Sequence, residues 1–112
     1  MLKQEIKEKI TQKSISLEEN GFSALAWNKE DAEDLIHEIM KDEIGILGGD
    51  VYQLTSTHLE PLPENWSCEP AEKESEGEFY LRSKSESLNY IKNYPIQPGE
   101  EILFSITFTE KI

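Results

Sequence analysis

Cysteine and histidine are scarce in this chain of 112 residues, which contains one Cys and two His. Cys68 has no partner for an internal disulfide bond, and a zinc site usually requires three or four protein ligands. The acidic segments also lack the D-x-[DN]-x-[DN]-G pattern of a calcium-binding loop. The sequence therefore predicts no disulfide, no metal site and no cofactor.

Long apolar runs are absent as well. No segment approaches the roughly 18 apolar residues of a membrane-spanning helix, and residues 1–7 are too charged for the apolar part of a secretory signal. Hydrophobic residues make up 37% of the chain and charged residues 30%. This length and composition are typical of one soluble domain. We therefore expect a single domain, residues 1–112, located in the cytoplasm and not bound to a membrane.

Positive charge is also in short supply. Eleven Lys and Arg residues face 23 Asp and Glu residues, which gives a net charge of −12 and a pI near 4.5. Such a charge repels nucleic acid and excludes it as an expected partner. It attracts basic protein surfaces, although solubility alone is a second explanation of the same excess.

Two segments have the periodicity of amphipathic helices. Residues 2–13 place apolar side chains four residues apart. Residues 79–94 form the other segment, which ends before Pro95 because the residue preceding a proline avoids the α region. The glutamate-rich stretch 60–78 is either a mobile loop or, in its last part, the first turns of this helix.

A further helix is predicted between these two. Asn28 is a suitable N-cap with Asp31 three residues on, and Gly45 is a suitable residue after the last turn. The outer face carries His37 and several acids. Acids at the C-terminal end oppose the helix dipole, which indicates a binding role for this face. The acids at that end are Asp42 and Glu43, and the partner contacts expected on this face are Glu33, Glu38 and Asp42.

Strands are predicted at residues 51–54, 59–62 and 102–109. The first two flank a turn, and prolines confine the second to a sheet edge. The third alternates apolar and polar side chains. Gly48 and Gly49 permit a positive φ or a β-bulge, and no phosphate-loop pattern surrounds them. The pattern predicts an α+β fold, with about three helices packed on a short, mostly antiparallel sheet.

Three strings in this order resemble the immunity protein 40 family of bacterial polymorphic toxin systems. They are Gly21–Ala32 (GFSALAWNKEDA), Ile46–Tyr52 (ILGGDVY) and Asn65–Trp66. The resemblance spans roughly residues 15–94. It implies a protein made beside a toxin, which it binds in the producing cell. We expect the chain to act by binding and not as an enzyme. The residues that match the pattern are Trp27, Gly48, Gly49, Asp50, Tyr52 and Trp66.

Two hypotheses follow for the function. In the first, the chain is an immunity protein that neutralises a cognate toxin domain, possibly a basic nuclease, by occlusion. In the second, it is a small enzyme or ligand-binding protein with a pocket near Asp50, Tyr52 and His37, although no nucleophile motif accompanies them. The sequence does not determine the oligomeric state. For the first hypothesis we expect partner contacts among Glu33, Glu38, Asp42, Asp50, Tyr52, Trp66, Glu72, Glu74 and Glu76.

Overall fold

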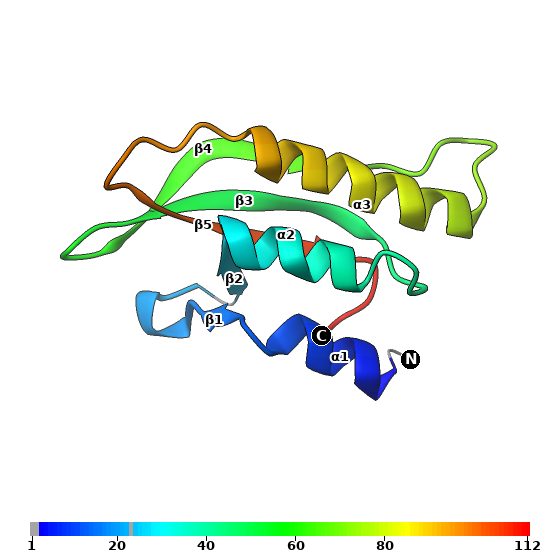
Figure 1. Cartoon of the computed structure of the whole chain (residues 1–112), viewed down its shortest axis with the longest axis horizontal. Coiled ribbons are helices and arrows are strands. Elements are labelled where there is room, and N and C mark those ends of the chain that lie inside the picture. The colour runs from blue at the N-terminus through cyan, green and yellow to red at the C-terminus, as the bar shows by residue number, and fades with distance from the viewer. Residues whose placement is uncertain (1–2, 23) are drawn as a thin grey trace.

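A computed structural model describes residues 3–22 and 24–112 (Figure 1). Its five strands form one antiparallel sheet in the order β1-β2-β5-β3-β4, with three helices and a short 3₁₀ helix, η1. This confirms the predicted α+β fold. Leu2, the first residue of the first predicted helix, lies outside the described residues. The elements are α1 (Gln4–Thr11), β1 (Ile15–Ser16), η1 (Glu18–Asn20), β2 (Leu25–Asn28), α2 (Lys29–Glu38), β3 (Ile46–Leu54), β4 (Leu59–Ser67), α3 (Glu76–Asn93) and β5 (Glu101–Phe108).

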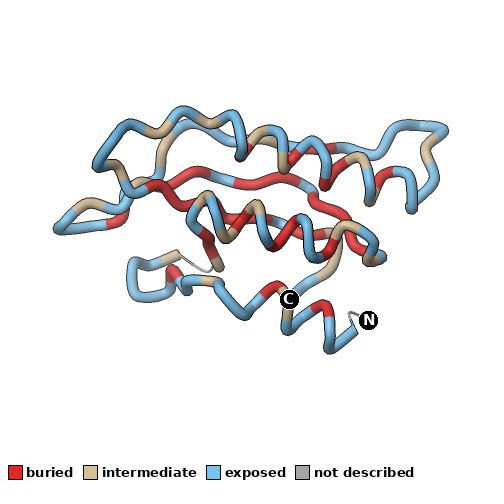
Figure 2. The backbone as a smooth tube through the Cα atoms, viewed as in Figure 1, coloured by how far each residue is buried: buried red, intermediate tan, exposed pale blue. Residues whose placement is uncertain are grey.

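The main core lies between the sheet and α2 and α3, which run side by side across one face (Figure 1). Because side chains of a strand alternate between faces, β5 sends every second residue into this core, as its sequence predicts. Figure 2 shows the buried positions concentrated along β3, β5 and the facing sides of α2 and α3. The β5 residues in this core are Ile102, Phe104, Ile106 and Phe108.

A second, smaller core lies on the opposite face of the sheet. The segment containing η1 folds under the sheet, where Phe22 meets Tyr52 with ring centroids 5.4 Å apart. Tyr52 is only 7% exposed as a result. The buried members of this cluster are Leu17, Ala26, Tyr52, Leu59 and Leu103.

The glycine pair shapes the start of β3. Gly48 has a φ of +146°, and the pairing of β3 with β5 shifts register between Ile46 and Gly48. These observations confirm the predicted backbone role for Gly48. Gly49 does not have a positive φ, but a Cβ there would overlap the ring of Trp66 and the carbonyl oxygen of Ser105.

The predicted end of the second helix is wrong. α2 begins after Asn28, whose side chain accepts a hydrogen bond from the Asp31 N–H at 2.8 Å, but it ends at Glu38 rather than near Gly45. Lys84 of α3, 1% exposed, accounts for the early end. Its ammonium donates to the carbonyl oxygens of Ile39 at 2.8 Å and Asp42 at 2.7 Å, which satisfies groups that a longer helix would have bonded internally.

Because α2 ends at Glu38, Asp42 lies in a turn beyond the helix. Its position therefore no longer indicates a charge that opposes the helix dipole. Burial lowers the pKa of Lys84, and the nearby Asp42 carboxylate opposes that shift. The lysine therefore joins the end of α2 to α3, a contact that no sequence pattern predicted.

The glutamate-rich stretch before the third helix divides into three parts. Residues 60–67 belong to the edge strand β4, residues 68–75 form a connection, and α3 begins at Glu76. Ser75 forms a capping box with Glu78, since each side chain accepts from the backbone N–H of the other residue at 3.2 Å and 2.9 Å. Of the helices in residues 3–22 and 24–112, none has the length and apolar character needed to cross a membrane.

Candidate partner-binding surface

The residues predicted to contact a partner do not form one site. Those of the second predicted helix lie on α2 and the turn after it, a second set lies in or beside the connection before α3, and a third set lies on β3 and β4. Each set has different surroundings. In each set, some side chains are bonded within the protein and others are exposed.

On the α2 side, Glu38 is exposed and Glu33 is half-buried. Asp42 forms an ion pair with Lys9 of α1, with Nζ and Oδ2 3.1 Å apart. Its carboxylate is thus engaged within the protein, and the pair attaches α1 beside α2. Glu38 remains the most accessible of the three predicted acids.

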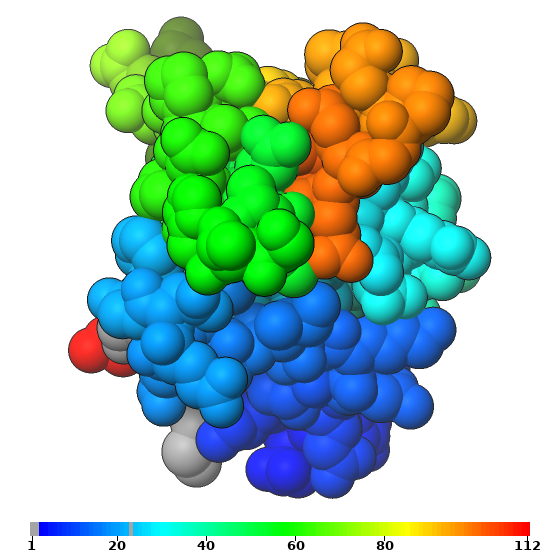
Figure 3. Space-filling model, turned by 90° about the vertical axis from the view of Figure 1, so that its left-hand side faces the viewer, coloured from blue at the N-terminus to red at the C-terminus, as the bar shows by residue number. Residues whose placement is uncertain are grey.

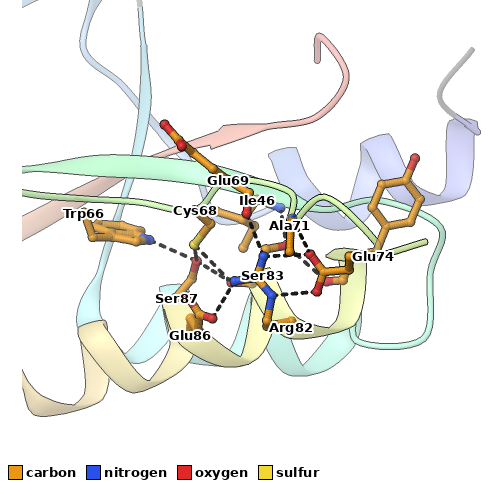
Figure 4. Close-up of polar contacts among 11 residues, drawn as sticks. Ile46, Trp66, Cys68, Glu69, Ala71, Glu74, Arg82, Ser83, Glu86 and Ser87 are labelled. Atoms are coloured by element: carbon orange, nitrogen blue, oxygen red, sulfur yellow. Dashed lines mark hydrogen bonds and ion pairs between the residues drawn. The ribbon is translucent and has the colours of Figure 1, made fainter. Parts of the chain in front are cut away.

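The connection before α3 is held in place by Arg82 (Figure 4). The guanidinium donates to both carboxylate oxygens of Glu74 at 2.7 Å and 2.8 Å, to Glu86 at 2.7 Å, and to the carbonyl oxygen of Glu69 at 2.7 Å. Such a bidentate pair fixes geometry as well as charge. Glu74 is therefore a structural residue, while Glu72 and Glu76 are exposed.

Replacing Arg82 with glutamine should raise the pKa of Glu74 from about 2 towards its ordinary value of 4.5. The hydrogen bonds from Arg82 are the main cause of the low value, followed by the bond from the Ala71 N–H. Because the folded-state pKa is depressed, these bonds stabilise the fold above pH 4.5 and lose their effect as the pH falls towards 2. A ¹³C carboxyl NMR titration measures this shift.

Lys73→Gln provides the control for that titration, because it removes a neighbouring exposed positive charge and leaves the Arg82 bonds intact. The pKa of Glu74 should stay low in this variant. An equally low pKa in Arg82→Gln would contradict the assigned role of the guanidinium.

At the N-terminal end of α3, Tyr80 bonds one carboxylate and lies in the electric field of two others. The Tyr80 hydroxyl donates to Glu76 at 2.9 Å. This bond, partial burial, and the charges of Glu76, Glu110 and Glu43 together raise the pKa of Tyr80. We call Glu43, Glu76, Glu110 and Tyr80 the acidic end. It unites the turn after α2, the start of α3 and the segment after β5, which the sequence did not place together.

Trp66 joins β4 to α3. Its indole N–H donates to the Ser87 hydroxyl at 2.9 Å, and Ser87 in turn donates to the Ser83 carbonyl oxygen at 2.7 Å (Figure 4). The Ser83 hydroxyl accepts from the N–H of Ile46 at 3.0 Å. Cys68 is buried beside these serines, and burial raises the pKa of its thiol. Trp66 therefore has a packing role, with one side left half-buried.

Asp50 and Tyr52 line a cavity of about 730 Å³ whose wall also includes residues of α1 and of the segment after β5. His37, the third residue of the enzyme hypothesis, is exposed on α2 and does not line this cavity. The sheet separates α2 from the small core that contains Tyr52. The single pocket expected from these three residues is therefore not formed.

The sequence patterns predicted no role for Arg82 or Lys84, although both residues organise this surface. The spacing of Arg82 and Glu86, four residues apart on one helix, is a recognisable signal of an ion pair. The long-range partners of Lys84 leave no such signal. Across residues 3–22 and 24–112, no group of three or more His, Cys, Asp or Glu side chains is arranged to hold a metal ion.

Comparison with known families supplies the identity that the geometry alone lacks. A family model described as immunity protein 40 matches residues 16–108. Comparisons with curated proteins and with solved structures gave no match. The matched range begins in β1 and ends with β5, so it contains all of the sheet except Ile15, together with α2 and α3. The chain belongs to the immunity protein 40 family.

Proposed function

We propose that this protein binds a cognate toxin domain in the cytoplasm of the producing cell and neutralises it by occlusion, acting as a single domain without catalysis of its own. The family match over residues 16–108 carries this proposal. An immunity protein must bind its toxin tightly and before the toxin meets its target, so both a fast encounter and a slow dissociation are needed.

The charge of the chain supports a basic toxin as the partner. The net charge is −12, and a large field of one sign accelerates the encounter with a surface of the opposite sign. The acidic end concentrates part of this charge on side chains that are exposed or half-buried. Nucleases are one class of toxin with a basic surface, because they must bind the phosphates of nucleic acid. We therefore favour a nuclease domain as the partner.

Production of the toxin domain encoded beside this chain, with and without the chain, tests the proposal. Cells that contain both proteins should grow, and the purified proteins should form a complex whose association rate falls with added salt. A chain that is folded but neither protects the cells nor binds that toxin would refute the immunity function. Protection with an association rate independent of salt would retain immunity and exclude steering.

A further inference from the structure

A shallow groove of about 580 Å³ lies between β4 and the C-terminal end of α3. Figure 3 shows a notch between these segments, drawn in green and orange. Tyr90 and Tyr94 provide its aromatic surface, with ring centroids 6.2 Å apart. Trp66 stacks on Tyr90 at 4.8 Å, and Phe104 meets Tyr94 at 5.5 Å, so both tyrosine rings are held in place. The groove is lined by Glu64, Asn89, Tyr90, Asn93, Tyr94 and Pro95.

The groove offers hydrogen-bond acceptors beside the donors of the Asn89 amide and the Tyr90 hydroxyl. The Tyr94 hydroxyl donates to one oxygen of the exposed Glu64 carboxylate at 2.8 Å, and the second oxygen has no partner among the described residues. The Asn93 amide nitrogen donates to the carbonyl and side-chain oxygens of Asn89 at 2.8 Å and 2.9 Å. These bonds leave the Asn93 side-chain oxygen as a further acceptor.

Glu64 is the one charged residue among those that line the groove, and its charge is negative. None of its lining residues carries a positive charge. Burial first, and then the hydrogen bond and charge of Glu64, raise the pKa of Tyr94 to about 12. The pKa of Tyr90 is also raised, by burial and by the charge of Glu64. A ligand of this groove should therefore be a cation that donates hydrogen bonds and has a flat apolar face.

On the basis of the proposed function, we propose that this groove receives an arginine side chain of the cognate toxin. A guanidinium is planar, always charged and a donor of five hydrogen bonds, and it stacks on aromatic rings. In this arrangement its plane would stack on Tyr90 or Tyr94, and its N–H groups would bond the Glu64 carboxylate. A lysine ammonium would satisfy the charge but offers no plane for stacking.

The groove and the acidic end would contribute differently to binding. Tyr80 lies in the second turn of α3, and Tyr94 follows its last residue. The 14 positions between them correspond to about 21 Å along the helix axis. Exposed acids act at a distance on the association rate. An arginine held by a carboxylate against a rigid aromatic ring is instead typical of an interface hot spot, which governs the dissociation rate.

The groove can be tested without the toxin by adding N-acetylarginine amide to the full chain and recording ¹H–¹⁵N NMR spectra. The Trp66 indole resonance should shift, because Trp66 stacks on Tyr90, while that of the buried Trp27 should not. The citrulline analogue, which has the same shape without the charge, should cause no shift. Equal shifts from both compounds, or no shift of Trp66 at millimolar arginine compound, would overturn the proposal.

Two variants test the contact in the complex. Glu64→Lys places a positive charge in the groove, and Glu60→Lys makes the same change of net charge at an exposed position of the same strand. Toxin dissociation should be about 10- to 100-fold faster for Glu64→Lys and nearly unchanged for Glu60→Lys. The Trp27 resonance reports that each variant is folded. Unchanged dissociation of a folded Glu64→Lys protein would exclude the groove and leave the immunity function intact.

Failure of the parent chain to bind any toxin would instead remove the proposed function. The arginine probe would then still decide whether the groove accepts a guanidinium. The two experiments thus separate an error in the function from an error in the position of the contact.

Discussion

Replacing Gly49 with valine should lower the free energy of unfolding by about 3 kcal/mol or more. The reason is a close approach and not an unusual φ, because any Cβ at Gly49 would overlap the Trp66 ring and the Ser105 carbonyl oxygen. The Trp66 ring is itself held by its bond to Ser87 and by stacking on Tyr90. The clash can therefore be relieved only by moving β3, β4 or β5. Chemical denaturation followed by far-ultraviolet circular dichroism measures the change.

Gly77→Ala is the matched control for a glycine replacement. Gly77 lies in the first turn of α3, and an added Cβ meets no atom within 4 Å. Because alanine has the higher helix propensity, this variant should be more stable by up to about 1 kcal/mol. A Gly49→Val protein as stable as the parent would show that the strands yield easily, and it would leave partner contact as the role of Gly49.

Reversing the charges of the acidic end should slow the association with a basic toxin by about 10- to 100-fold at low salt. The variant Glu43→Lys, Glu76→Lys and Glu110→Lys changes three residues outside the core. The effect should shrink as salt screens the charges, and the dissociation rate should change less. Stopped-flow kinetics with the toxin domain at several salt concentrations measures both rates.

A second triple variant gives the same change of net charge on the exposed side of α2. Its substitutions are Glu30→Lys, Asp34→Lys and Glu38→Lys, all at exposed positions. Two acids that the sequence suggested, Asp42 and Glu74, are left out because they bond to Lys9 and Arg82. A larger effect of the first variant would place the toxin near the acidic end, and a larger effect of the second would place it over α2. If both variants associate with the toxin as fast as the parent chain, the net charge serves solubility and not binding.

Local signals predicted most of the secondary structure correctly. The Asn28 cap, the proline after α3 and the alternation of β5 act between near neighbours in the chain, and all three have the expected structural effect. The predicted end of α2 was wrong because Lys84, 45 positions further along the chain, donates a hydrogen bond to the carbonyl oxygen of Ile39. No window of the sequence contains that contact.

The candidate site was less predictable than the fold. Its acids were found by composition, but composition does not distinguish a free carboxylate from one that an arginine or lysine neutralises. Tyr52 and Trp66 matched a family pattern, and the structure assigns both to packing, one buried under Phe22 and the other bonded to Ser87. Tyr90 and Tyr94 were not predicted as binding residues, because residues four apart on a helix also form the stripe that faces a core.

The sequence alone determined the α+β class, the excess of negative charge and the resemblance to the immunity protein 40 family. These properties depend on composition, on short-range periodicity and on local strings. Only the tertiary structure decided which charges are free, which aromatic residues form a groove and which elements meet at the acidic end. Those features depend on contacts between residues far apart in the chain, such as Glu64 with Tyr94 and Trp66 with Ser87, and folding alone brings them together.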